Sequence, residues 1–127
     1  MAWRYVQRTG WLYGPDGHLL ARGYAGKGIG KDNPALEDVA DVGPLPAGEY
    51  LIGAPEDSEK LGPVALPLIP VEAIKRAGFF VHGDSLIHPG EASEGCIVLP
   101  AVVRQAMAQS KDKLLTVEHG ADPAPEG

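Results

Sequence analysis

The sequence is poor in cysteine and in clustered positive charge. Cys96 is its only cysteine, which excludes an intrachain disulfide and a zinc site with several thiolate ligands. The 11 Lys and Arg are outnumbered by 17 Asp and Glu, so the net charge is -6, and the longest basic cluster is Lys75-Arg76. Because phosphate backbones and anionic surfaces require clustered cations, we expect no binding of nucleic acid.

Long apolar segments are also missing. No stretch approaches the ~20 consecutive apolar residues that span a bilayer, so we expect no membrane insertion. The first ten residues, MAWRYVQRTG, contain charged and polar side chains where a signal peptide requires an unbroken apolar segment. The sequence therefore predicts a protein made in the cytoplasm without an export signal of its own. No residue pattern implies a metal or an organic cofactor.

Glycine and proline are abundant, whereas aromatic residues make up only 6% of the chain. The 17 Gly and 12 Pro predict many turns and few long helices. The strongest local pattern is a hairpin, in which segments 11–13 and 18–21 flank the turn Gly14-Pro15-Asp16-Gly17. Further strands are expected near residues 3–6, 49–52, 64–69, 79–81, 96–99 and 114–117. Pro67 favours an edge strand or a bulge.

Helical periodicity is limited to the C-terminal third of the chain. Val102, Val103, Ala106 and Met107 recur at helical spacing after Pro100, which predicts a helix over about 100–110. One or two helical turns are also expected over 71–77, ended by Gly78. The turn-rich segment 23–47 has the length of a functional loop. We therefore predict a mainly β, single compact domain at 1–119 with one or two short helices, followed by a flexible tail at 120–127.

The segment 79–99, FFVHGDSLIHPGEASEGCIVL, contains the residues suited to chemistry. A short apolar strand ends at His82-Gly83, and a polar loop leads to Cys96 at the start of a second apolar strand, 14 positions after His82. Adjacent strands joined in this way would bring the imidazole near the thiol. An imidazole can accept the proton of a thiol, whose ordinary pKa is ~8.5, and the imidazolium can then protonate a leaving amine. The alternative for Cys96 is a buried, inert thiol.

The residues before Cys96 are candidates for contact with substrate. Gly95 would let a substrate carbonyl approach the backbone, so that amides near Gly95 and Cys96 form an oxyanion hole. Ser93 either braces the turn through its hydroxyl or contacts substrate. Glu94 completes this candidate substrate-binding segment.

Four further side chains have both functional and structural interpretations. Asp84 either orients His82, binds a substrate amine or only forms a turn. Arg104 is either a solvated helix residue or a ligand for a substrate carboxylate, and Arg76 is an alternative ligand. His88 competes for the role of base, but it lies beside a proline in a loop and is expected to be exposed.

Three separated motifs resemble the L,D-transpeptidases, and in particular a compact branch found among type VI secretion effectors. They are VHGD at Val81–Asp84, SEGCIVL at Ser93–Leu99 and the earlier GPLPAGEY at Gly43–Tyr50. The hairpin region Gly10–Gly26 is also similar to the opening of that branch. The resemblance covers most of residues 10–105 and implies an L,D-transpeptidase-like catalytic domain.

The resemblance implies a cysteine enzyme acting on a peptidoglycan stem peptide. Cys96 would attack the bond before the terminal D-Ala of a tetrapeptide stem, with His82 as base and Gly83 in the catalytic motif, and form a thioester. Water would complete L,D-carboxypeptidase trimming, and a free D-amino acid would complete exchange. The branch consists of antibacterial effectors that act in the periplasm of a target bacterium and have a cognate immunity protein.

Two departures from the common family pattern bear on the reaction. Glu94 stands where the family usually has His, and Val98-Leu99 stand where an Arg or Asn is familiar. The missing His affects cross-linking more than thiolate formation. Two alternatives remain open, namely a transpeptidase that forms 3-3 cross-links in the cell's own wall and a catalytically inert wall-binding module.

Overall fold

One curved sheet forms most of the computed structural model, which describes residues 2–58, 62–74, 76–85, 87–88, 90–93 and 95–120. Its strands are β1 (Trp3–Val6), β2 (Trp11–Tyr13), β3 (Leu19–Arg22), β4 (Tyr24–Ala25), β5 (Gly48–Ile52), β6 (Glu56–Ser58), β7 (Gly62–Pro70), β8 (Phe79–His82), β9 (Ile97–Val98) and β10 (Leu114–Glu118). The helices are η1 (Gly28–Gly30), η2 (Pro34–Leu36) and α1 (Ala101–Gln109). This mainly β, compact domain confirms the predicted fold class. No helix within the described residues is long and apolar enough to cross a membrane.

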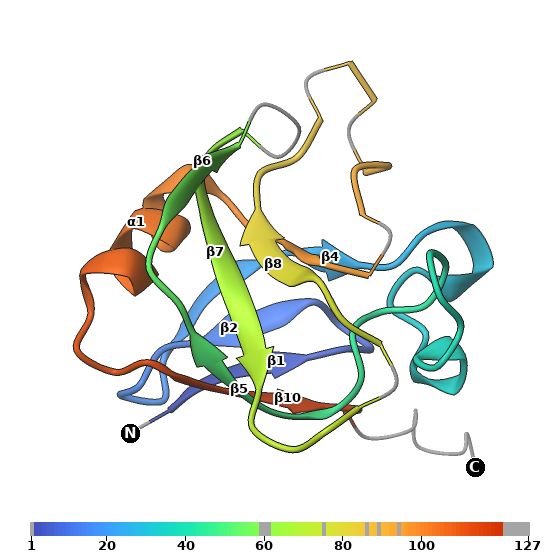
Figure 1. Ribbon diagram of the computed structural model, residues 1–127, viewed down its shortest axis with the longest axis horizontal. Coiled ribbons are helices and arrows are strands. Elements are labelled where there is room, and N and C mark those ends of the chain that lie inside the picture. The colour runs from blue at the N-terminus through green and yellow to red at the C-terminus, as the bar shows by residue number, and fades with distance from the viewer. Residues whose placement is uncertain are drawn as a thin grey trace, which may run out of the picture.

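The sheet curls until its two ends approach each other (Figure 1). The strand order is β3-β2-β1-β10-β5-β7-β8-β9-β4, with β6 paired to β7 beside this path. β3 ends at Arg22 and β4 begins at Tyr24, so Gly23 alone separates the two ends of the sheet along the chain. The Gly23 N–H donates to the Gly10 carbonyl at 2.7 Å. The pairs β1–β10 and β8–β9 are parallel, and the other pairs are antiparallel.

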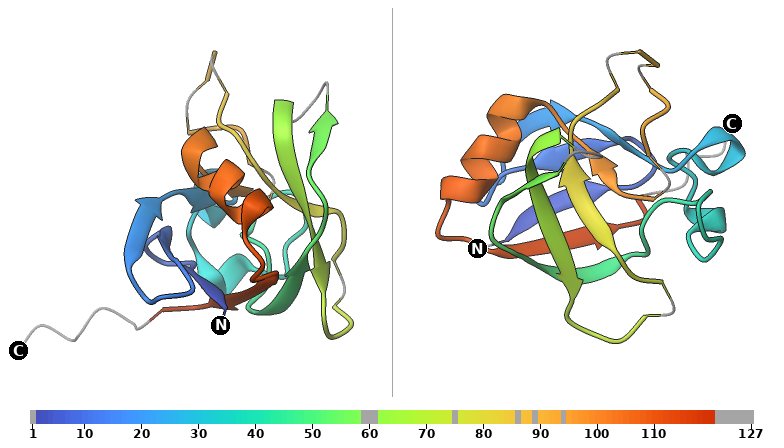
Figure 2. Two further views of the ribbon diagram at one scale, coloured as in Figure 1. Left: turned by 90° about the vertical axis from the view of Figure 1, so that its left-hand side faces the viewer. Right: turned by 45° about the horizontal axis from the view of Figure 1, so that its top comes forward.

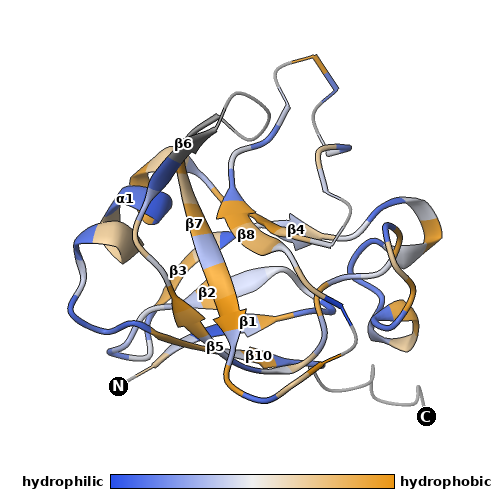
Figure 3. Cartoon of the chain, in the orientation of Figure 1, coloured by the Kyte–Doolittle hydropathy of each residue, from blue (hydrophilic) through white to orange (hydrophobic). Residues whose placement is uncertain are grey.

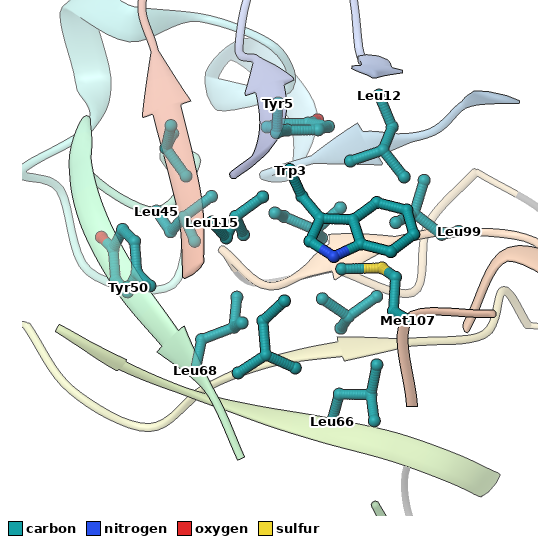
Figure 4. Close-up of a cluster of buried hydrophobic side chains, with 14 of the residues drawn as sticks. Trp3, Tyr5, Leu12, Leu45, Tyr50, Leu66, Leu68, Leu99, Met107 and Leu115 are labelled. Carbon is teal, nitrogen blue, oxygen red and sulfur yellow. The ribbon is translucent and has the colours of Figure 1, made fainter. Parts of the chain in front are cut away.

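The hydrophobic core fills the inside of the curled sheet. Figure 4 shows side chains from strands, loops and the helix α1 meeting there, among them Trp3, Tyr5, Leu12, Leu45, Tyr50, Leu66, Leu68, Leu99, Met107 and Leu115. α1 lies beside β7 (Figure 2) and inserts Met107 into this core. Pro100 caps the helix in an extended conformation, and its carbonyl accepts from the N–H groups of Val103 and Arg104. The helix predicted at 100–110 is therefore confirmed.

The expected helix at 71–77 is wrong over the part of that segment that the structure describes. The Val71 N–H donates to the Glu49 carbonyl at 2.9 Å, which extends the pairing of β7 with β5 beyond the end of the strand. The chain then reverses into β8, the antiparallel neighbour of β7. Because β7 and β8 are adjacent, these residues serve as an irregular connection between them.

Two other expectations also change. Pro67 lies in β7, which is flanked by β5 and β8, so β7 is not an edge strand. The Gly53 N–H donates to the Pro67 carbonyl just beyond the end of β5. A residue without an N–H is tolerated there, because a strand can lack an N–H where its regular pairing ends. The segment 23–47 contains β4, η1 and η2 in addition to loops. The predicted tail is described only at Gly120, and residues 121–127 lie outside the described residues.

The adjacent valines of α1 provide a matched test of the core. Val103 is 8% exposed, whereas Val102 is 78% exposed. Val103→Ala is expected to lower the free energy of unfolding by about 2 kcal/mol, because it removes buried methyl groups and leaves a cavity. Val102→Ala is expected to change it by less than about 0.5 kcal/mol, since alanine favours a helix and little area is lost. Urea unfolding measures both, and equal losses would contradict the placement of α1.

Candidate active site

The parallel pairing of β8 with β9 brings the segment that holds Cys96 beside the strand that ends at His82. The register pairs Val81 with Ile97 and His82 with Val98. Val81 and Ile97 are fully buried and point into the core. Since side chains alternate along a strand, His82 points to the other face of β8. Cys96 lies in a bend just before β9, and its half-buried side chain packs against the hydrophobic core. Figure 3 shows the change in polarity at this point, where the hydrophobic strand β8 gives way to a hydrophilic segment.

The thiol of Cys96 is half-buried and faces the backbone at the start of β8. The Phe80 N–H donates to Cys96 Sγ at 3.3 Å, and Sγ lies 3.9 Å from the Gly78 carbonyl oxygen. An N–H group directed at sulfur stabilises the thiolate. Both contacts lie at the start of β8, whereas His82 is the last residue of that strand.

His82 ends β8 and is 3% exposed. Its Nδ1 lies 2.8 Å from the Gly83 carbonyl oxygen. A carbonyl only accepts, so Nδ1 carries the proton and Nε2 retains its lone pair. Burial lowers the pKa of His82, and the positive charge of Arg104 lowers it further, against the opposing effects of Gly83 and Asp84. The ring is therefore neutral at pH 7 and has the tautomer that a base acting through Nε2 requires.

Ser93 is a buried connector in the loop before Cys96. Its Oγ accepts from the N–H groups of Gly26, at 2.9 Å, and Gly95, at 3.0 Å. The same hydroxyl donates to the Cys96 carbonyl at 2.6 Å. Of its two interpretations, these contacts support bracing of the turn. They also engage the Gly95 N–H, which the sequence assigned to the oxyanion hole. Glu94 lies outside the described residues.

Gly95 connects two motifs that are far apart in the sequence. Its carbonyl accepts from the Leu45 N–H at 2.9 Å, which joins the GPLPAGEY segment to the loop that holds Cys96. Its φ of +139° is one that L side chains rarely adopt, and a Cβ there would lie 2.5 Å from Arg76 Nη2. Only glycine fits between Arg76 and the rest of the loop.

Arg76 comes from the connection between β7 and β8 and lies beneath this loop. Its Nη1 donates to three carbonyls, at 2.7 Å for Glu37, 3.1 Å for Gly43 and 2.9 Å for Pro44. Its guanidinium also lies 4.9 Å from the centre of the Phe79 ring. Burial lowers the pKa of Arg76, while interactions with Asp41, Tyr50 and Cys96 act in the opposite direction. Arg76 therefore fixes a positive charge next to the thiol, a position that sequence spacing did not indicate.

Arg104 is the second arginine of the site, and it lies near the imidazole of His82 as Arg76 lies near the thiol. It is 9% exposed, so a solvated helix residue is the wrong description. Its Nε donates to the Leu99 carbonyl at 3.0 Å and its Nη1 to the Val64 carbonyl at 3.3 Å. A Cβ on Gly83 would lie 2.8 Å from Nη2, so the guanidinium packs directly against Gly83. Burial lowers the pKa of Arg104.

Asp84 organises the loop that follows β8. Its carboxylate accepts from Tyr24 Oη at 2.7 Å and from the N–H groups of Ser85, at 2.8 Å, and Gly90, at 3.1 Å. Burial opposes ionisation, but these hydrogen bonds lower the pKa of Asp84 overall. Tyr24 Oη also accepts from the Ala92 N–H at 2.8 Å. The contacts support the turn-forming interpretation of Asp84, and Tyr24 is a partner that no sequence motif identified.

His88 does not join this group. It is exposed, and its Nδ1 lies 3.6 Å from the exposed Glu91 carboxylate. Its position in the loop beyond Asp84 gives it no rigid strand to direct the ring. His82 is thus the better placed of the two candidate bases.

Comparison with known proteins identifies the segment that holds these residues. A family model, the Tlde1 domain, matches residues 20–118. The match includes the whole of the segment from β4 to α1, and therefore Cys96, His82 and both arginines. A search of curated proteins finds no match to this chain.

Removal of the Ser93 hydroxyl tests whether this group braces the loop before Cys96. Ser93→Ala would leave the buried N–H groups of Gly26 and Gly95 without their acceptor, and is expected to lower the free energy of unfolding by about 2–4 kcal/mol. Ser85→Ala is the matched control, because Ser85 Oγ accepts two N–H groups in an exposed turn where water can replace it. Its expected cost is below about 1 kcal/mol. Similar losses in the two variants, measured by urea unfolding, would contradict the bracing role.

Proposed function

Because this chain belongs to the Tlde1 domain family of type VI secretion L,D-transpeptidase effectors, we propose that it is a cysteine acyltransferase that removes the terminal D-Ala from tetrapeptide stems. The family consists of peptidoglycan-targeting effectors that are secreted into target cells. The observation that carries the proposal is the pairing of β8 with β9, which brings the segments of His82 and Cys96 side by side, with His82 Nδ1 held by the Gly83 carbonyl.

Acylation begins with transfer of a proton from Cys96 Sγ to His82 Nε2. The thiolate attacks the carbonyl carbon of the third stem residue, and the tetrahedral intermediate carries its negative charge on the former carbonyl oxygen. The Cys96 amide is our candidate donor to this oxygen. Collapse of the intermediate breaks the C–N bond, the imidazolium protonates the departing amine, and D-Ala leaves with its α-amine intact.

Deacylation resolves the thioester on Cys96. His82 Nε2 accepts a proton from a water molecule, and hydroxide addition followed by loss of the thiolate releases a tripeptide stem. A free D-amino acid can replace water, in which case its amine forms the new amide bond and the stem is exchanged. Both outcomes remove the tetrapeptide that serves as donor in cross-linking.

The electrostatic environment of Cys96 supports a reactive thiol. The Phe80 N–H points at Sγ, and the Arg76 guanidinium is fixed against the neighbouring Gly95. Both favour the thiolate over the thiol. Stabilisation of this charge lowers the cost of the first proton transfer.

The biological setting completes the proposal. Residues 1–119 form the catalytic domain, which acts in the periplasm of a target bacterium after delivery by the secretion machinery. A cell that makes such an enzyme is exposed to its activity, so we expect a cognate immunity protein.

Mass spectrometry of a purified disaccharide-tetrapeptide tests the reaction. The wild-type protein is expected to convert it to the tripeptide with loss of one alanine, and added D-methionine is expected to appear in an exchange product. Cys96→Ala is expected to abolish both products, because no thioester can form. His82→Gln is expected to reduce both by at least ~100-fold, since it removes the base.

Three results would contradict this assignment. Tripeptide formation by Cys96→Ala would exclude the thioester. The appearance of 3-3 cross-linked dimers as the main product would favour a wall-building transpeptidase. An unchanged tetrapeptide with folded, reduced wild-type protein would favour the inert wall-binding module.

The role of Arg76 is tested through the pH dependence of alkylation. In Arg76→Met the midpoint for reaction of Cys96 with iodoacetamide is expected to rise by about 0.5–1 pH unit, because the thiolate loses a nearby positive charge. Arg76→Lys keeps the charge and is expected to shift the midpoint less. Circular dichroism checks that each variant is folded. A midpoint that is unchanged in a folded Arg76→Met protein would rule out electrostatic activation by this residue.

A further inference from the structure

A cleft of about 580 Å³ opens next to the carboxyl ends of β8 and β9. The residues that line the cleft include Gly83, which follows His82, and Val98, the strand partner of His82. The cleft therefore lies on the imidazole side of the candidate catalytic pair. The other walls come from the end of β3, the start of β4, the residues after η1 and the start of α1.

The described residues that line the cleft give it an excess of positive charge. Arg22, Lys31 and Arg104 are its cations, and Asp32 and Asp84 are its carboxylates. The protein as a whole has a net charge of -6. A local positive excess in an acidic protein favours a negatively charged ligand group.

The two carboxylates are engaged by the protein itself. Asp84 accepts hydrogen bonds from Tyr24 and from two backbone N–H groups, as described above. Asp32 Oδ1 accepts from the Ala25 N–H at 3.1 Å, and burial raises the pKa of Asp32. The charges of Arg22 and Lys31 act on Asp32, and that of Lys31 also acts on Asp84, so the two carboxylates offset part of the positive charge. The three cations of the lining still outnumber the two carboxylates.

Arg22 and Lys31, by contrast, each have more N–H groups than the hydrogen bonds described for them use. Arg22 Nε donates to the Thr9 carbonyl at 3.1 Å. Lys31 Nζ donates to the Gly90 carbonyl at 3.1 Å and lies 4.3 Å from the centre of the Tyr24 ring. Both side chains are exposed, and a guanidinium has five N–H donors and an ammonium has three. Further hydrogen bonds from both residues can reach an anionic group in the cleft.

The proposed reaction fixes where such a group would lie. His82 protonates the amine of the departing D-amino acid, and the carboxylate of that amino acid is joined to the same Cα as the amine. The carboxylate is thus held within a few ångströms of the imidazole. We propose that the cleft is the subsite for the free carboxylate of the terminal D-amino acid, bound by Arg22 and Lys31. This assignment rests on the proposed function.

The subsite would also restrict the substrates. A stem whose fourth residue is already joined to another stem has an amide in place of this carboxylate, so it loses the charged contact. An incoming D-amino acid has the carboxylate and would enter the same subsite during exchange. The enzyme is therefore specific for uncross-linked tetrapeptide stems.

The test compares a tetrapeptide stem that ends in a free carboxylate with the same stem ending in a carboxamide. The wild-type protein is expected to show a kcat/KM at least about tenfold higher for the acid, the size of a charge-assisted hydrogen bond. Arg22→Gln combined with Lys31→Gln is expected to lower kcat/KM for the acid by about 10- to 100-fold and leave the amide unchanged. Lys27→Gln, an exposed lysine that is not among the described cleft residues, is the matched control and is expected to behave as wild type.

Binding measurements separate this proposal from the proposed function. Calorimetry with Cys96→Ala is expected to show weaker binding of the amide than of the acid, and the Arg22 and Lys31 substitutions are expected to remove the difference. Cysteine-dependent trimming with equal use of acid and amide would overturn the subsite and leave the function intact. Absence of trimming together with selective binding of the acid would overturn the function and leave the carboxylate site. Selectivity that persists in the double variant would overturn the assignment of Arg22 and Lys31.

Discussion

The parallel pairing of β8 with β9 is the constraint on which the site depends. A shift of one residue in β8 would turn His82 toward the core and Val81 away from it, because side chains alternate along a strand. The register is held from inside by Val81 and Ile97, which are fully buried. The residues that pack the core therefore also determine the position of the residues that we propose to be catalytic.

Buried and partly buried polar groups hold the loops against this pair of strands. The three bonds of Ser93 and the three carbonyl contacts of Arg76 tie the residues before Cys96 to segments near residues 26 and 43. A loop rich in glycine has little side-chain area to bury, so it cannot be fixed by hydrophobic packing. Hydrogen bonds in a low-dielectric setting supply the order instead, and they make the loop sensitive to the loss of a single donor or acceptor.

The sequence predicted the elements with strong local patterns. The hairpin after Trp11, the helix after Pro100 and the strand that ends at His82 all follow from turn chemistry or periodicity. The sequence did not predict the segments whose conformation depends on tertiary contacts. β4 has only two residues within a glycine-rich segment, and the connection at 71–77 is shaped by pairing with β5 and by the reach of Arg76. The contact of Tyr24 with Asp84 spans 60 positions, so no local pattern could reveal it.

Two guanidinium groups, one partly buried and one buried, lie on opposite sides of the proposed catalytic pair. Arg76 lies on the thiol side, where a positive charge favours the thiolate, and Arg104 packs against Gly83 on the imidazole side, where it lowers the pKa of His82. The second effect opposes formation of the imidazolium, so it raises the cost of taking the proton from Cys96. It also makes the imidazolium a stronger acid, which assists protonation of the departing amine. An amine leaves far less readily than a thiolate, so in the proposed reaction a pair tuned in this way would favour expulsion of the D-amino acid over return of the substrate.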